Sequence, residues 1–227
     1  IDINYLPARE VTQGSSDIIV AVLDHGTQLD HPDLNVSSKS YDTETGRSPS
    51  QIWGNHGTAC SGIISAKTNN NLGVAGIAPN CPVMSISNQL MGTSDAPQKR
   101  ADGFNWAWRN GASVISNSWR SSTFSELLED AIQSAMTNGR NGLGCVVTFS
   151  AGNYDSNTVG YPARSLPDII VVGALSLSGK RKSSTTIDNE GWWGSDYGTQ
   201  LDIMAPGVLI YTTDRTTRVR DYNDVTT

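Results

Sequence analysis

The amino-acid sequence predicts an α/β protein in which helices cover a mostly parallel sheet. Its apolar runs are continuous rather than alternating, as in Ile18–Leu23, which lies between Asp17 and Asp24. Continuous apolar runs are typical of strands buried on both faces, the usual situation in a parallel sheet. Segments with helical periodicity separate several of these runs. The strands therefore need crossover connections, which defines the α/β class.

The expected strands follow one another along the whole chain. After Ile18–Leu23, five more apolar runs are predicted strands: Val83–Ile86, Val114–Ile115, Cys145–Phe149, Ile169–Ala174 and Leu201–Met204. The 22 glycines suit tight turns between strands and helices.

Two helices are marked by their apolar spacing and by their ends. The first carries apolar residues from Ala101 to Trp108 and is expected to end at Asn110–Gly111. The second is predicted to open with a capping box over Thr123–Glu126 and to end at Asn138–Gly139. Residues 176–200 are polar and are expected to form a surface excursion. The polar tail from Asp214 to Thr227 resembles a loop cut in mid-course.

Composition limits the class of protein. The chain has 227 residues, of which 37% are hydrophobic and 17% charged, and it shows no repeat or linker. We therefore expect one domain over residues 1–227. The formal net charge of −6 argues against nucleic-acid binding. No apolar run approaches the roughly 20 residues that span a bilayer, so we expect no membrane partner.

The cysteine count limits the covalent cross-links. Cys60, Cys81 and Cys145 are an odd number, so one internal disulfide at most can form, and their spacing is not typical of a metal site. We favour buried thiols, the common state of free cysteine.

Three polar side chains stand where catalytic groups are found in α/β proteins. Asp24 ends the first apolar run, His56 precedes a glycine at the start of a small-residue run, and Asn153 follows Ser150–Gly152 at the end of another run. Ligands bind at the carboxyl ends of strands in such sheets. An aspartate can orient an imidazole, and an asparagine amide can donate to an oxyanion. Taken singly, each is equally a turn residue or an ordinary histidine.

The order of several motifs resembles the subtilisin-like serine proteases, or subtilases. The resemblance is carried by the Asp24 and His56 motifs and by five further segments: His31–Leu34, Gly73–Pro79, Ser150–Asn153, Tyr161–Ala163 and Met204–Val208. It implies a three-layer, doubly wound fold with Asp24 orienting the imidazole, His56 as general base and Asn153 as oxyanion donor. It also implies secretion, a peptide or protein substrate, and an interaction with the protein's own propeptide or C-terminal fragment.

The same resemblance implies a peptide-binding site. The family's substrate-pairing edge strand falls on Ser116, Asn117, Ser118, Trp119 and Arg120, and the facing pocket wall falls on Ser150, Ala151 and Gly152. An extended peptide would pair with such a strand through its backbone. Arg120 replaces a small residue of the family pattern. A large cation there narrows the pocket or favours an acidic partner, or else, as we favour, it turns to solvent.

A structural calcium site is implied in the same way. The family's ligands fall on the side chains of Asp33 and Asn70 and on the carbonyls of Thr68, Leu72 and Val74, with Asp2 or Asn4 as a further contributor. Hard oxygen ligands of this kind suit Ca²⁺.

This sequence departs from the family pattern at the segment that carries the nucleophile. A Gly-Thr-Ser-x-Ala-x-Pro segment is expected beyond Ala205–Gly207, and the sequence reaches Thr227 without it. Gly92–Pro97 resembles this segment, but Ser94 or Asp95 as a helix cap before Pro97 explains it without catalysis. We therefore expect a serine endopeptidase whose serine lies beyond residue 227, so that this C-terminally incomplete chain is inactive alone.

Two other functions remain open. The first is an inactive subtilase-like domain that binds peptides without cleaving them. The second is a nucleotide-binding α/β domain, which Asp24 disfavours because a carboxylate stands where a phosphate would bind.

Overall fold

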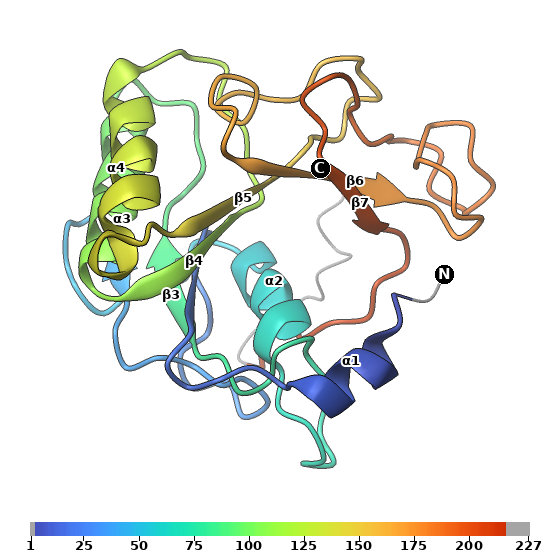
Figure 1. The fold of residues 1–227 in the computed structure, drawn as a ribbon, viewed down its shortest axis with the longest axis horizontal. Coiled ribbons are helices and arrows are strands. Elements are labelled where there is room, and N and C mark those ends of the chain that lie inside the picture. The colour runs from blue at the N-terminus through green and yellow to red at the C-terminus, as the bar shows by residue number, and fades with distance from the viewer. Residues whose placement is uncertain (1–2, 217–227) are drawn as a thin grey trace.

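A computed structural model describes residues 3–216 of the chain, and within them a single sheet of seven parallel strands forms the centre of the fold (Figure 1). The strands are β1 Ile19–Asp24, β2 Tyr41–Asp42, β3 Val83–Ser87, β4 Ala112–Asn117, β5 Val146–Ser150, β6 Ile170–Leu175 and β7 Ile203–Pro206. Their order is β2-β3-β1-β4-β5-β6-β7. The winding reverses at β1, which confirms the doubly wound α/β class and opens a crevice at the carboxyl ends of β1 and β4.

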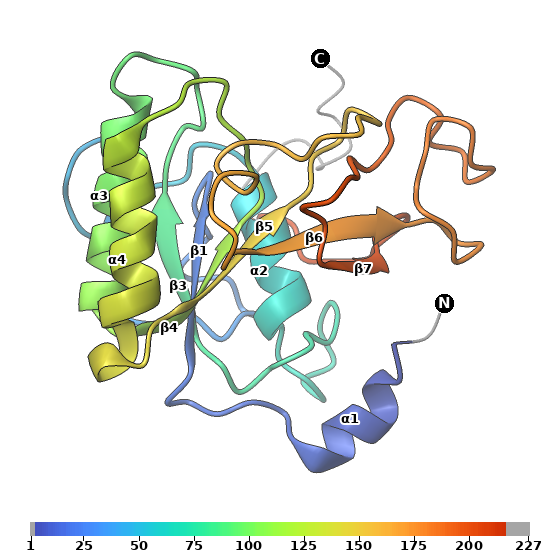
Figure 2. The same cartoon turned by 45° about the horizontal axis from the view of Figure 1, so that its top comes forward.

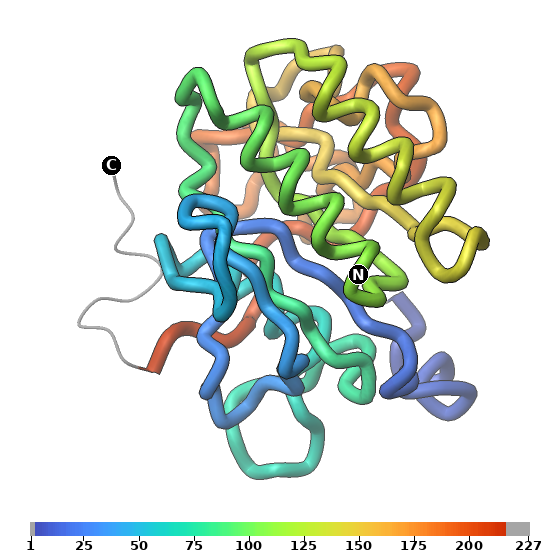
Figure 3. The backbone as a smooth tube through the Cα atoms, turned by 90° about the vertical axis from the view of Figure 1, so that its left-hand side faces the viewer, coloured from blue at the N-terminus to red at the C-terminus, as the bar shows by residue number. Residues whose placement is uncertain are grey.

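Helices lie on both faces of this sheet. The described part of the chain contains the helices α1 Tyr5–Val11, α2 His56–Ser65, α3 Ala96–Arg109 and α4 Glu126–Gly142. The pair α3 and α4 covers one face, and α2 lies on the other (Figures 1 and 2). Figure 3 shows α3 and α4 running side by side. The architecture is therefore three-layered around β1, β3 and β4.

The main core lies between the sheet and the α3–α4 layer. Strand residues such as Leu23, Ile86 and Ile115 are fully buried against apolar helix residues such as Phe104 and Leu128. On the opposite face, the buried residues of α2 are small or carry a hydroxyl group, such as Thr58 and Ser61. Both bond to the segment just after β1, which positions the amino end of α2 at the end of that strand.

The predicted elements are present, with shifted bounds. The strand predicted over Val114–Ile115 extends over Ala112–Asn117, and the strand predicted from Leu201 begins at Ile203. Neither α1 nor the two-residue β2 was predicted, because both are too short to show a period. No helix within residues 3–216 has the length and apolar character needed to cross a membrane.

The start of α4 differs from the predicted capping box. Ser125, not Thr123, is the N-cap, and its hydroxyl oxygen accepts a hydrogen bond from the amide of Leu128 at 3.3 Å. The Thr123 carbonyl instead accepts from the Ser121 hydroxyl, which holds Thr123 in the preceding turn. The regular helix stops near the predicted Asn138–Gly139, since Arg140 and Asn141 have positive φ angles of 51° and 58°.

The polar segment 176–200 is not simply the surface excursion that its composition predicted. Lys182 and Asp196 are fully buried, and Asp188 is 4% exposed. The Lys182 ammonium group donates to the carbonyls of Ser183, Glu190 and Trp193 at 2.8–3.0 Å. A buried cation therefore organises the inside of this loop, while its outer residues face solvent.

Candidate active site

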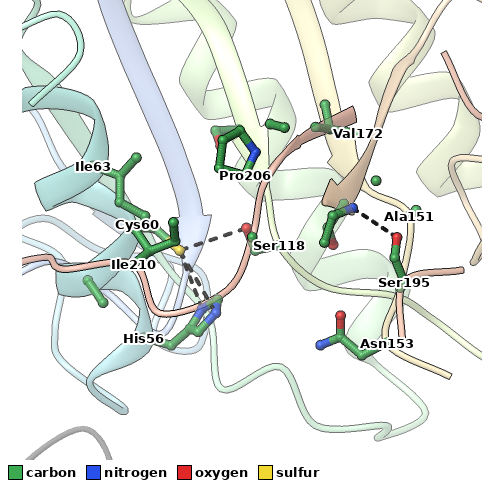
Figure 4. A pocket seen from close by; sticks show the side chains of 18 of the residues that line it. His56, Cys60, Ile63, Ser118, Ala151, Asn153, Val172, Ser195, Pro206 and Ile210 are labelled. Carbon is green, nitrogen blue, oxygen red and sulfur yellow. Dashed lines mark hydrogen bonds between the residues drawn. The ribbon is translucent and has the colours of Figure 1, made fainter. Parts of the chain in front are cut away.

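A cleft of about 950 Å³ lies at the carboxyl ends of the central strands. Residues from several parts of the fold line it, among them His56 and Cys60 of α2, Ser116–Ser118 at the end of β4, Ser150–Asn153 at the end of β5, and 205–207 and 209–212 at and after the end of β7. Figure 4 shows His56 and Asn153 on opposite sides of this space. The cleft thus gathers groups that are far apart in the sequence.

Asp24 and His56 form a close pair at one side of the cleft. Nδ1 of His56 lies 2.9 Å from Oδ1 and 2.8 Å from Oδ2 of Asp24. Asp24 is fully buried, whereas the His56 side chain is 32% exposed. The Asp24 carboxylate also accepts the backbone N–H of His25 at 2.7 Å, which fixes its orientation. A buried carboxylate on Nδ1 fixes the imidazole tautomer and stabilises the imidazolium.

Two glycines allow this pairing. A Cβ on Gly57 would collide with the backbone of Gly26, so only glycine lets the start of α2 approach the end of β1 this closely. Gly26 has a φ of +92°, a conformation that other residues rarely adopt. The backbone N–H of Gln28 donates to the Thr58 hydroxyl oxygen at 3.0 Å and joins the same two segments. Gly26 and Gly57 are therefore part of what brings Asp24 and His56 together.

The environment of His56 favours its protonated form. Burial lowers the pKa of His56, but the hydrogen bond to Asp24 and the neighbouring Cys60 outweigh this and raise the net pKa above the ordinary 6.5. Sγ of Cys60 lies 3.6 Å from Nδ1 of His56 and 3.8 Å from Oγ of Ser118. The surroundings of His56 therefore stabilise its protonated imidazolium form.

Asn153 is an exposed residue across the cleft from His56, and its amide nitrogen lies on the His56 side (Figure 4). It follows Gly152, which has a φ of +115° and whose Cβ position the Asp196 carboxylate occupies. The backbone turn at Gly152 therefore directs Asn153 into the cleft.

The predicted peptide-binding segment Ser116–Arg120 is not an edge strand, which corrects that expectation. Ser116 and Asn117 belong to β4 and pair on both sides, with β1 and β5. Their backbone is committed to the sheet, so only Ser118–Arg120 extend beyond the paired region. Ser116, Asn117 and Ser118 do line the cleft. Trp119 is instead 7% exposed and meets Phe149 edge to face in the core.

Arg120 does not simply extend into solvent as favoured above. Its guanidinium lies 4.4 Å from the centre of the Tyr154 ring, and Nη1 lies 3.6 Å from Oδ2 of the buried Asp196. The side chain remains 42% exposed. Arg120 therefore lies along the wall beside Ser150–Gly152, held by one aromatic and one acidic neighbour.

The predicted calcium ligands come together in part. Asp33 is buried, and the 68–74 loop closes over it: Asn70 donates its amide to Oδ1 at 2.7 Å, and the Val74 N–H donates to Oδ2 at 3.0 Å. Asn70 thus directs its amide nitrogen at Asp33, while its Oδ1 accepts the Leu72 N–H at 3.1 Å. The carboxylate and the amide are residue types that bind Ca²⁺, and the Asp33 carboxylate is the hard oxygen donor that this loop encloses. Thr68 and Leu72 lie in the same loop, Asn4 lies just before α1, and Asp2 lies outside the described residues.

Several residues that line the cleft were not indicated by the sequence, and three of them are polar groups with a defined contact. Glu190 and Trp193 of the 176–200 segment line it, and the Trp193 indole N–H donates to the Glu190 carboxylate at 2.7 Å. In the sequence, this segment could be recognised only as polar. The sequence analysis considered Cys60 only as a thiol. Its contact with His56 arises because the two residues are four apart on α2 and so share one face of that helix.

The remaining sequence expectations concern Ser94 and the cysteines. Asp95 is the N-cap of α3 and a proline stands in its first turn, while Ser94 does not line the cleft that contains His56. All three cysteines are free, with Cys81 and Cys145 buried and Cys60 partly exposed.

Comparison with known proteins gives consistent matches along the chain. A family model described as the subtilase family matches residues 15–226. Subtilisin NAT of Bacillus subtilis subsp. natto is 34% identical over 204 residues, which cover 87% of this chain and 49% of that protein. Thermophilic serine proteinase of Bacillus sp. (strain AK1) is 35% identical over 207 residues, which cover 91% of this chain and 48% of that protein. Subtilisin Savinase of Lederbergia lenta is 34% identical over 198 residues, which cover 87% and 66%. The chain thus spans about half the length of the first two relatives.

Proposed function

The chain belongs to the subtilase family, and on that premise we propose that the full-length protein is a serine endopeptidase acting on peptides or proteins. The observation that carries the proposal is the contact between Nδ1 of His56 and both carboxylate oxygens of buried Asp24, at 2.9 and 2.8 Å. This contact lies at a cleft large enough for a peptide segment.

In the proposed reaction each polar group has one role. Asp24 holds the imidazole, and His56 takes the proton of a serine hydroxyl supplied by the part of the full-length protein that follows residue 227. The serine oxygen attacks the scissile carbonyl, and the Asn153 amide and a backbone N–H donate to the oxyanion. His56 then gives its proton to the leaving amine, and water hydrolyses the acyl-enzyme.

The substrate is proposed to lie along Ser116–Arg120 and to face Ser150–Gly152. The lining of the cleft by Ser116–Ser118 and by Ser150–Asn153 supports this placement. Beyond the last paired residue of β4, the backbone of Ser118–Arg120 can pair with an extended peptide. The protein's own propeptide or C-terminal fragment is proposed to occupy the same cleft.

We propose Ca²⁺ as a structural cofactor at Asp33 and Asn70, with the carbonyls of Thr68, Leu72 and Val74 as further ligands. The closure of the 68–74 loop over buried Asp33 supports the site. Bound Ca²⁺ would neutralise the carboxylate and tie the loop to the body of the protein. The proposed location is outside the cytoplasm, which rests on family membership alone.

A fluorophosphonate probe on the full-length protein tests the endopeptidase proposal. Covalent labelling is expected for the wild-type protein and is expected to fail for His56→Ala. Asn153→Leu is expected to lower kcat by about 10²–10³-fold, as loss of an oxyanion donor does. A folded full-length protein that binds peptides without labelling or cleavage would instead identify an inactive peptide-binding domain.

A further inference from the structure

A second, smaller cavity lies outside the catalytic cleft. It has a volume of about 80 Å³ and is lined on one side by Leu90, Gly92, Thr93, Ala96 and Pro97 and on the other by 120–123. Both Arg100 of α3 and Arg120 line it, and no acidic residue does. The lining of the cavity therefore includes two arginines and no carboxylate, and of the two arginines only Arg120 has an acidic neighbour within 4 Å among the described residues, Asp196.

Arg100 is the unusual member of this pair. It is 2% exposed, yet it forms no ion pair within residues 3–216. Nη2 donates to the Met91 carbonyl at 3.2 Å, and Nε has no hydrogen-bond partner among the described residues. The Arg100 guanidinium carbon lies 4.7 Å from the centre of the Trp119 ring.

The acidic residues near Arg100 are already matched by other cations. The charge of Glu44 raises the pKa of Arg100 without forming an ion pair with it. Oε2 of Glu44 instead lies 2.7 Å from Nζ of Lys99. Asp95 pairs with Lys99 at 2.8 Å, and Asp196 lies beside Arg120. Burial lowers the pKa of Arg100, which reflects the cost of holding this charge away from water. A buried cation without a counter-charge is destabilising unless a ligand supplies one.

The position of the cavity suggests what that ligand is. Ser116–Ser118 line the catalytic cleft, and two residues further Arg120 lines the cavity. A peptide extended along this segment would pass from the cleft to the mouth of the cavity. This step rests on the peptide-binding role proposed above.

We propose that the cavity binds an acidic side chain of the peptide substrate, with Arg100 as its counter-charge. Guanidinium groups bind carboxylates through two parallel hydrogen bonds, and Arg100 has an unpartnered Nε to offer. A volume of about 80 Å³ exceeds the 10–15 Å³ that one water needs, so a carboxylate group can enter. Arg100 is thereby a specificity-determining residue.

The test uses the full-length protein and quenched fluorescent peptides that carry Glu or Gln at one position at a time. Each of the five positions on either side of the cleaved bond is compared. At one position, kcat/KM for the Glu peptide is expected to exceed that for the Gln peptide by about 10- to 100-fold. Arg100→Met is expected to reduce this ratio to near one. Arg109→Met removes an exposed charge from the same helix and is expected to leave the ratio unchanged.

Comparing Glu with Gln within one variant cancels changes in overall activity. A wild-type ratio near one at every position overturns the proposal, and so does a high ratio that persists in Arg100→Met. If Arg100→Met does not fold, Arg100→Lys tests the same point, since a lysine cannot form the two-bonded contact and should lower the ratio.

Failure of the endopeptidase proposal gives a different result. The protein would then neither label with fluorophosphonate nor cleave any peptide. The same Glu and Gln peptides would be compared by fluorescence anisotropy of binding. Tighter binding of one Glu peptide that depends on Arg100 supports the cavity, and equal binding of every pair overturns it.

Discussion

The thiol of Cys60 lies 3.6 Å from Nδ1 of His56, one helical turn along α2. Residues four apart share a helix face, so the thiol lies directly beside the imidazole. Sγ of Cys60, a carboxylate oxygen of Asp24 and a ring nitrogen of His56 all lie within 4.8 Å of one another. This geometry makes Cys60 a point at which the proposed catalysis can be blocked without touching a catalytic group.

We therefore predict that a methylthiolating reagent inactivates the full-length enzyme through Cys60. A group added to Sγ would displace the imidazole from Asp24 and should lower kcat/KM at least 100-fold, roughly the loss caused by a 1 Å misplacement of a reacting group. Cys60→Ala should resist the reagent. Cys81 and Cys145 are only 4% and 6% exposed, so they serve as internal controls. Equal inactivation of Cys60→Ala would show that another group is the target.

A second prediction concerns the pH dependence of activity. General-base catalysis needs neutral His56, whose pKa is raised above 6.5 by Asp24 and Cys60 despite the opposing effect of burial. The acid limb of the kcat/KM profile should therefore have its midpoint above pH 6.5. Folding stability depends on pH in the opposite direction to activity. The His56–Asp24 pair stabilises the folded state fully below pH 6.5, and this stabilisation is lost as the pH rises through the folded-state pKa of His56.

Asp24→Asn separates these effects. Burial lowers the pKa of His56, and Asp24 is one of the two groups that raise it, so loss of the carboxylate should lower the pKa and move the acid limb to lower pH. The rate should also fall by about 10⁴-fold because the wrong tautomer is favoured. Asp30→Asn changes an exposed carboxylate nearby and should alter neither property. A profile unchanged in Asp24→Asn would mean that His56 is not the titrating base.

The central sheet was predictable from local patterns, because continuous apolar runs specify buried parallel strands. The Asp24–His56 pair was predictable only from the order of motifs that resembles the subtilases, since each of the two residues taken singly is an ordinary polar residue beside a turn. The burial of Lys182 among backbone carbonyls was not predictable, because a polar segment gives no sign of which of its lysines will be buried. The interior position of Ser116 and Asn117 likewise depends on β5 packing beside β4, which is a long-range contact. The orientation of Arg120 depends on Tyr154 and Asp196, which come from two other segments.

The third prediction concerns the loop around Asp33. If the site binds Ca²⁺ in the folded state alone, saturating Ca²⁺ should raise Tm by about 5–10 °C relative to EDTA, which corresponds to a concentration near 100 times Kd. Asp33→Asn should abolish the difference between Ca²⁺ and EDTA, whereas Asp17→Asn, at an exposed site, should preserve it. A wild-type Tm that does not respond to Ca²⁺ contradicts the calcium proposal. Differential scanning calorimetry of the full-length protein gives the measurement.

The last prediction concerns Lys182, whose fully buried ammonium group binds three carbonyls and lies 3.4 Å from Oδ1 of Asp188. Lys182→Met keeps the length of the side chain but leaves these carbonyls and Asp188 without their cation. Since breaking a buried charge network is strongly destabilising, Tm should fall by about 10 °C. Glu190 and Trp193 of the same loop line the cleft, so KM for peptides should rise as the loop loosens. Lys180→Met, at an exposed site two residues away, is the matched control and should change neither Tm nor KM. A Lys182→Met protein with the Tm and KM of wild type would show that the loop holds its shape without the buried charge.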